Sequence, residues 1–173
     1  MIATPLLRHI GDEWHAGRLT LAQEHLASAK LQGVLADIMR SMAPAPAAPS
    51  VLLATPAGER HVVGALLAAA AAAAEGWSVV FLGADLPASE IAAAAIATGA
   101  RAVGISLLYI DNRERTLSEV NALRTRLPAD VPAFVGGAAS AAITRDLEQL
   151  GMRVVPDLAA FRAALRATLA AAK

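Results

Sequence analysis

The sequence contains no cysteine, and only 3% of its 173 residues are aromatic. The lack of cysteine excludes disulfide bonds, zinc–thiolate sites and thiol catalysis. Hydrophobic residues nevertheless make up 56% of the chain, and alanine is prominent among them. With so few aromatic rings, the core is expected to form through closely packed helices and not around large side chains.

The sequence also lacks an excess of charge of either sign. Fifteen Lys and Arg residues balance fifteen Asp and Glu residues, so no basic stripe predicts direct binding of nucleic acid. The longest stretch of low polarity, residues 62–74, is shorter than the ~20 apolar residues that cross a bilayer. The first residues show no signal-peptide pattern. We therefore expect a cytoplasmic protein without a membrane segment.

Proline is concentrated in one place, residues 43–50, which contain three of the nine prolines. This composition favours an extended linker and divides the chain into a helical region, 1–42, and a larger domain, 51–173. Two helical patterns precede the linker, the second starting with a capping box formed by Thr20 and Gln23. Apolar residues at helical spacing follow in that second pattern: Leu31, Val34, Leu35, Ile38, Met39 and Met42.

Apolar strands and helical patterns alternate after the linker. Strands are expected at 51–55, 77–82, 102–107, 131–135 and 152–155, and the helices that follow them at 61–75, 87–98, 113–127, 139–150 and 158–171. Five such units predict an α/β fold: a doubly wound, five-stranded parallel sheet of the Rossmann or flavodoxin-like kind, with helices on both faces. Trp77 is expected in its core. Ligands of such folds bind beyond the carboxyl ends of the strands.

Four residues with special properties fall at the ends of the first, third and fourth strands: His61, Ser106, Gly136 and Gly137. Taken singly, each is an ordinary loop or turn residue. Taken together, they should converge at one edge of the sheet, where a histidine would be available to a metal-containing ligand.

The spacing of these residues carries a family resemblance. Glu59-Arg60-His61-Val62-Val63-Gly64 is followed by 41 residues and then Ser106-Leu107-Leu108, and a further 27 residues lead to Gly136-Gly137. This arrangement resembles the Asp-x-His-x-x-Gly, Ser-x-Leu and Gly-Gly pattern of the cobalamin-binding domain family. Glu59, in place of the aspartate, is a departure from that pattern.

The resemblance implies a role for each motif. His61 would be the lower axial ligand of cobalt, and Glu59 would accept a hydrogen bond from its other ring nitrogen. Ser106 would bind the benzimidazole of the cofactor, and the glycines would leave room for the nucleotide tail. The implied cofactor contacts within the motifs are Glu59, Arg60, Val62, Gly64, Ser106, Leu108, Gly136 and Gly137.

The region before the linker resembles a more particular group. Trp14, followed after nine residues by Glu24-His25, is similar to the cap of adenosylcobalamin-dependent photoreceptors of the CarH and LitR type. The resemblance implies that Trp14, Glu24 and His25 surround the adenosyl group, and that His15 binds cobalt from above after light, when hydroxocobalamin can form. The alternative is that Trp14 is a core anchor between two helices and that His15 and His25 are solvated.

Two departures from that group shape the functional hypothesis. The photoreceptors carry a DNA-binding domain before the cap, which is not expected here, and their cap has four helices where this sequence predicts two. We expect a homo-oligomer, or a protein partner that completes the cap. The predicted function is therefore light-responsive adenosylcobalamin binding without catalysis, acting in signalling or transcription regulation through a partner. The alternatives are a corrinoid carrier module of a methyltransferase or mutase, and a simple cobalamin carrier.

Overall fold

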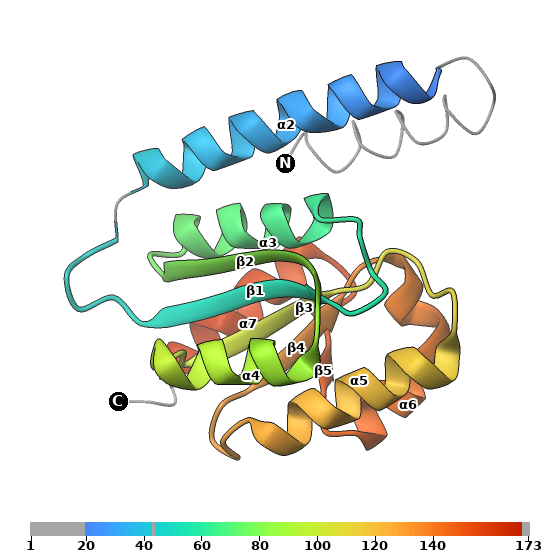
Figure 1. The fold of residues 1–173 in the computed structure, drawn as a ribbon. Helices are drawn as coiled ribbons and strands as arrows, with labels where there is room; N and C mark the ends of the chain where they lie inside the picture. The colour runs from blue at the N-terminus through green and yellow to red at the C-terminus, as the bar shows by residue number, and fades with distance from the viewer. Residues whose placement is uncertain (1–19, 43, 171–173) are drawn as a thin grey trace.

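The computed structural model describes residues 20–42 and 44–170. A long helix, α2 (Leu21–Ser41), precedes five strands that alternate with helices (Figure 1). The elements of the domain are β1 (Ser50–Pro56), α3 (Val63–Ala74), β2 (Ser78–Leu86), α4 (Ala88–Ala97), β3 (Ala102–Ser106), α5 (Arg113–Arg126), β4 (Ala133–Gly136), η1 (Ala138–Ile143), α6 (Thr144–Gln149), β5 (Arg153–Val154) and α7 (Leu158–Ala170).

The five strands form one parallel sheet in the order β2-β1-β3-β4-β5. The predicted doubly wound fold is confirmed. The order reverses at β1, so the connections after β1 and β3 leave the sheet on opposite faces and open a crevice at its carboxyl edge. The loops that follow β1 and β3 therefore lie beside each other at this edge.

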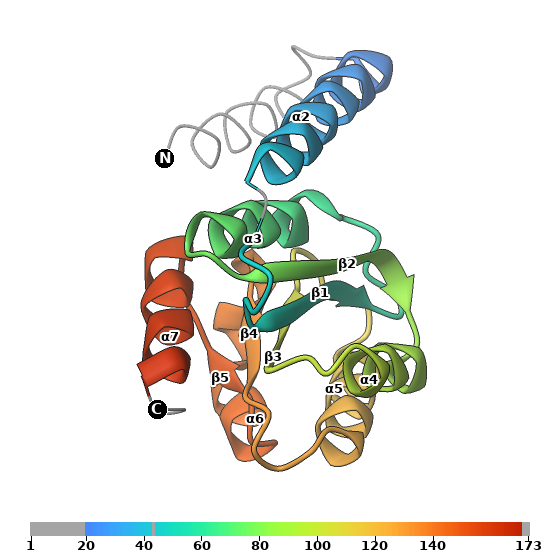
Figure 2. The same ribbon diagram turned by 90° about the vertical axis from the view of Figure 1, so that its left-hand side faces the viewer.

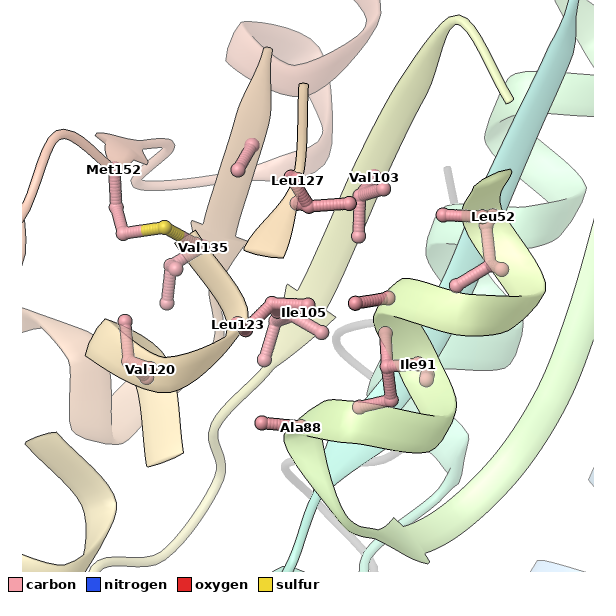
Figure 3. Packing of buried hydrophobic residues seen from close by; sticks show 14 of the residues in the cluster. Leu52, Ala88, Ile91, Val103, Ile105, Val120, Leu123, Leu127, Val135 and Met152 are labelled. Atoms are coloured by element: carbon pink, nitrogen blue, oxygen red, sulfur yellow. The ribbon is translucent and has the colours of Figure 1, made fainter. Parts of the chain in front are cut away.

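Helices cover both faces of the sheet, as Figure 2 shows. On one face, α4, α5 and α6 pack against Leu52, Val103 and Ile105 of the strands (Figure 3). On the other face, α3 and α7 cover Val51 and Leu53. Neighbouring residues of β1 thus enter opposite cores, which explains why this strand is apolar throughout and shows no alternation.

Alanine allows the helices to lie close to the sheet. In α3 the buried side chains include Ala65, Ala69 and Ala72, and in α4 they include Ala88 and Ala92. The low aromatic content is compatible with a closed core because these helices fill it with small side chains. Trp77 lies immediately before β2 and is buried, as predicted.

Helix α2 lies outside this domain and runs along α3 (Figures 1 and 2). It begins with the predicted capping box, in which the Thr20 hydroxyl accepts from the Gln23 backbone N–H and the Gln23 side chain accepts from the N–H of Thr20. Buried Leu35 packs against Leu66 and Leu67 of α3. Of the residues described in the predicted linker, 44–49 lie in neither helix nor strand. The described helices include none that is both long and apolar enough to span a bilayer.

The structure corrects several predicted boundaries. The second strand extends to Leu86 instead of ending at residue 82, because its last residues bulge and continue to pair with β1. The helix predicted at 139–150 is divided into the 3₁₀ helix η1 and the short helix α6. Helix α3 starts at Val63, since His61 belongs to the preceding loop. The helical pattern predicted before residue 18 lies outside the described residues.

An ion-pair cluster joins α3 to α7 at the opposite edge of the sheet. The carboxylate of Glu75, which is largely buried, accepts hydrogen bonds from Arg162 Nε at 2.5 Å and from Arg166 Nη1 at 2.9 Å. Burial favours the neutral carboxyl, but the two guanidinium groups outweigh it and lower the pKa of Glu75. This cluster fastens the last helix to the domain far from the carboxyl edge.

Candidate cobalamin site

His61 lies in the loop between β1 and α3 and is fixed by Glu59. The Glu59 carboxylate is buried, with 2% of its side chain exposed, and its Oε1 lies 2.6 Å from His61 Nδ1. The same oxygen accepts the backbone N–H of His61 at 2.8 Å. Because a carboxylate only accepts hydrogen bonds, Nδ1 carries the proton and Nε2 retains the lone pair that can bind a metal. The imidazole side chain is 58% exposed, so a large ligand can reach it.

The second oxygen of Glu59 holds the loop after β3. Its Oε2 accepts the backbone N–H groups of Leu108 and Tyr109, each at 2.7 Å. One buried carboxylate therefore joins the two loops of the crevice and accepts four hydrogen bonds in total. Glutamate, with one more methylene than the aspartate of the family pattern, spans both loops and retains the bond to His61.

The glycines and the serine of the motifs lie in close contact. A Cβ placed on Gly64 would come within 2.4 Å of Ser106 Oγ, and one on Gly137 would come within 2.2 Å of the carbonyl oxygen of Leu107. Gly137 also has a φ of +101°, which disfavours other residues. A Cβ on Gly136 would meet Val155 at 3.2 Å. Any larger residue at Gly64 or Gly137 would fill the space beside Ser106 and the end of β3.

The remaining predicted residues are distributed around this centre. Arg60 is exposed, and its Nε lies 3.7 Å from Asp85. Val62 is half-buried and packs in the cluster between α2 and α3. Leu108 is exposed beside Glu59, as is Tyr109, a residue that is 62% accessible. Tyr109 belongs to no motif, and its position next to the site follows only from the folded loop.

The predicted cap residues fall partly outside the described chain. Glu24 and His25 lie in the first two turns of α2. Figure 1 shows that α2 begins beyond the start of α3, on the side of the carboxyl edge. Trp14 and His15 lie outside the described residues.

Two cavities border the described part of the chain near these elements. One of about 330 Å³ is lined by residues such as Met39, Trp77 and Phe81, between α2 and β2 and away from the His61 loop. The other, about 50 Å³, lies next to Glu59 and Tyr109 at the carboxyl edge. The smaller cavity is adjacent to the site but has room for only a few water molecules. A ligand of His61 would therefore lie on the outer surface of the crevice.

The donor set fits a corrinoid. His61 offers one oriented nitrogen, and the hydrogen bond from Nδ1 to Glu59 fixes the tautomer of its ring. A Cβ at position 64 would fill the space beside Ser106. A single imidazole suits a metal whose equatorial ligands come from a macrocycle, with the imidazole in an axial position.

Comparison with known proteins agrees with this fit. The family model described as B12 binding domain matches residues 49–165, and a second model with the same description matches residues 2–37. The chain belongs to the B12-binding domain family and is similar to CarH-type members of it.

Two curated relatives come from Myxococcus xanthus. The chain is 37% identical over 134 residues to the HTH-type transcriptional repressor CarA, covering 77% of this chain and 44% of CarA. It is 33% identical over 153 residues to the HTH-type transcriptional repressor CarH, covering 88% of this chain and 51% of CarH. The chain thus spans about half the length of these relatives. The solved structure of the Methanosarcina barkeri monomethylamine corrinoid protein shares the fold, with a TM-score of 0.66 and 20% identity over 93% of this chain and 78% of that one.

Proposed function

We propose that this protein binds adenosylcobalamin, with His61 as the lower axial ligand of cobalt, and responds to light. The observation that carries the proposal is the 2.6 Å contact between buried Glu59 and His61 Nδ1, which leaves Nε2 as the coordinating atom. The exposure of the imidazole at the carboxyl edge supports the same role.

The residues below the cofactor would have two roles, which are to orient His61 and to accommodate the nucleotide tail. Glu59 orients His61 and keeps its proton on Nδ1. Gly64, Ser106, Gly136 and Gly137 border the path proposed for the nucleotide tail, and Ser106 would hydrogen-bond its base. The exposed side chains of Arg60, Leu108 and Tyr109 would contact the rim of the corrin from the protein side.

The proposed light response depends on the helical region. When bound, adenosylcobalamin supplies a cobalt–carbon bond that light breaks. Trp14, Glu24 and His25 would enclose the adenosyl group, and His15 would take the upper position after light has removed it. Support comes from the similarity to the repressors CarA and CarH and from α2, which begins on the side of the carboxyl edge (Figure 1).

The output would be a change in assembly or in partner binding. Helix α2 carries large apolar side chains that remain exposed among the described residues, Leu21, Leu26, Val34 and Ile38, and such surface favours association. A second copy of the chain, or another protein, would cover them. We propose that the protein is not itself an enzyme and that residues 1–42 and 51–173 act as cap and cofactor domain.

Reconstitution in the dark tests this function. The purified protein is mixed with adenosyl-, methyl- or hydroxocobalamin, and absorption spectra and mass are recorded before and after light. We expect stable binding of adenosylcobalamin, loss of that binding in His61→Ala, and a light-dependent change of mass. Because His61 is an exposed loop residue, its replacement should leave the fold intact. Binding unaffected by His61→Ala would contradict the ligand role.

Further outcomes separate the remaining parts of the proposal. His15→Ala should leave dark binding intact and alter the spectrum after illumination; an unchanged spectrum would rule out His15 as the upper ligand. A mass that is the same in dark and light would count against the light-driven output and favour a simple carrier. The fold shared with the monomethylamine corrinoid protein makes a methyl-transfer carrier the other candidate, and a preference for methylcobalamin over adenosylcobalamin would favour it.

A further inference from the structure

We infer that Asp85, at the end of β2, is a positioning residue that holds the His61 loop in its ligand-binding shape. The inference rests on the proposed role of His61 as the cobalt ligand. Asp85 belongs to none of the motifs and lies on β2, which contributes no motif residue. Its backbone conformation and its hydrogen bonds all point to the loop that carries Glu59 and His61.

The first observation is the conformation of Asp85. Its φ is +60°, and it is the one non-glycine residue with positive φ in the described part of the chain. Aspartate enters this left-handed region more readily than most residues, but at a cost in free energy. Such a conformation persists only where surrounding interactions determine it. The pairing of β1 with β2 is also irregular here, with one extra residue between Gly83 and Leu86, and this bulge brings Asp85 over the loop.

The second observation is that both the side chain and the backbone of Asp85 bind the loop. Oδ1 accepts the backbone N–H of Gly58 at 2.8 Å. The N–H of Asp85 lies 3.1 Å from the carbonyl oxygen of Glu59 and 3.0 Å from Thr55 Oγ1. The buried hydroxyl of Thr55 donates to the same Glu59 carbonyl. These bonds hold the backbone of Gly58 and Glu59 against Asp85 and the Thr55 side chain.

The loop itself contains a tight turn that would otherwise be free to open. The N–H of Glu59 bonds the carbonyl of Pro56 at 3.0 Å, and Gly58 has a φ of +93°, which corresponds to a turn with glycine at its third position. The peptide N–H of Gly58 points out of such a turn and needs an acceptor. Asp85 supplies that acceptor from the neighbouring strand.

The consequence for the site is preorganisation. With the backbone of Glu59 held by Asp85 and Thr55, its carboxylate stays buried and reaches His61 from below. These hydrogen bonds from Asp85 and Thr55 thus hold His61 Nε2 in position before the cofactor binds, which lowers the entropy lost on binding. The contact between Asp85 Oδ2 and Arg60 Nε, 3.7 Å on the surface, contributes little, so the charge of Asp85 matters less than its acceptor oxygen.

Two substitutions separate these contributions. Asp85→Gly tolerates the positive φ and keeps the backbone bonds, but removes the acceptor for Gly58. Asp85→Asn keeps an acceptor oxygen and tolerates the same φ, but removes the charge. The loss of one such hydrogen bond corresponds to about a tenfold change in an equilibrium constant. We expect hydroxocobalamin to bind about tenfold more weakly to Asp85→Gly and within about twofold of wild type to Asp85→Asn.

The cofactor-free protein gives an independent readout. Amide hydrogen exchange of residues 57–61 should be about tenfold faster in Asp85→Gly than in wild type and unchanged in Asp85→Asn. In ¹⁵N-labelled protein, the electron paramagnetic resonance spectrum of bound cob(II)alamin should show less splitting by an axial ¹⁵N in Asp85→Gly, because the benzimidazole of the unlabelled cofactor contributes only ¹⁴N. Glu75→Gln, at the opposite edge of the sheet, is the control for general loss of stability and should leave both readouts unchanged.

The outcomes distinguish this inference from the proposed function. Wild-type exchange rates and nitrogen splitting in Asp85→Gly would overturn the role of Asp85, as would an equal loss in Glu75→Gln. If the labelled wild-type protein shows no splitting by ¹⁵N, or His61→Ala leaves that splitting unchanged, the proposed ligand role fails. The exchange rates then decide whether Asp85 holds the loop, since they do not require the cofactor.

Discussion

Replacement of Glu59 by glutamine tests the carboxylate that joins the two loops. Its four acceptor contacts divide evenly: Oε1 faces the backbone N–H and Nδ1 of His61, and Oε2 faces the N–H groups of Leu108 and Tyr109. Glutamine replaces one of these oxygens by an NH₂ group, which donates and cannot accept. In either orientation of the amide, two of the four contacts are lost or inverted.

The magnitude follows from the number of contacts. A hydrogen bond to a charged group contributes at least about 1.5 kcal/mol, so the loss of two lowers the free energy of unfolding by about 3 kcal/mol. For a chain of this size, that corresponds to a fall in melting temperature of about 10 °C. If the NH₂ group faces His61, its Nδ1 becomes the acceptor and the proton moves to Nε2, which removes the lone pair available to cobalt.

Urea unfolding and cobalamin titration provide the assay. The expected result for Glu59→Gln is a loss of stability, together with a loss of nitrogen coordination to cobalt in those folded molecules whose amide NH₂ group faces His61. Glu119→Gln is a matched control, because Glu119 accepts a single bond, from the N–H of Ala88, which the amide oxygen can retain. A loss below about 1 kcal/mol in Glu59→Gln, equal to that of the control, would refute the four-contact account.

Three further predictions concern stability. Glu75→Gln should lower the free energy of unfolding by about 1 kcal/mol at pH 7. Because folding lowers the pKa of Glu75, this difference from wild type should shrink as the pH falls below about 4.3 and through the folded pKa. Urea unfolding at pH 7 and at pH 3 measures the difference. Gly137→Ala should lower the free energy of unfolding by more than about 2 kcal/mol. Gly58 also has a positive φ, but nothing lies within 4 Å of a Cβ placed on it, so Gly58→Ala should lower that free energy by about 1 kcal/mol. Equal melting temperatures for the two variants would contradict the close approach at Gly137. Leu35→Ala should weaken the packing of α2 on the domain by about 2 to 3 kcal/mol. Val34→Ala should weaken it much less, because Val34 is 53% exposed. Equal rates of proteolysis within α2 in the two variants would refute the packing at Leu35.

Most of the fold could be predicted because the chain repeats one unit. The strands are mainly apolar, and helix signals follow each of them at short spacing, so the order of elements indicated a parallel sheet. The errors lie where tertiary contacts decide. The extension of β2 to Leu86 accompanies hydrogen bonds of Asp85 with Gly58 and Thr55, which lie far away in the sequence, and no local pattern around residue 83 contains that information.

The candidate site shows the same division. Their positions at strand ends predicted that His61, Ser106 and Gly137 share one edge of the sheet, and the structure places them there, with Glu59 beside His61. The partners of Glu59 Oε2 are backbone N–H groups, which every residue possesses, so no residue type could signal them. Tyr109 and Asp85 were missed for related reasons: one follows a motif, and the other lies on a strand outside the pattern.

The described packing of α2 against α3 lies toward the linker end of the helix, where Leu35 is buried and Leu31 and Met39 pack beside it. That packing centres on Leu35, while the first residue of α2, Leu21, lies 14 positions away, or about 21 Å at the rise of an α-helix. A rotation of about 10° around that pivot would carry the beginning of α2 by about 4 Å. A displacement smaller than an ångström beside Leu66 and Leu67 is therefore amplified several-fold where α2 begins, at the carboxyl edge of the sheet.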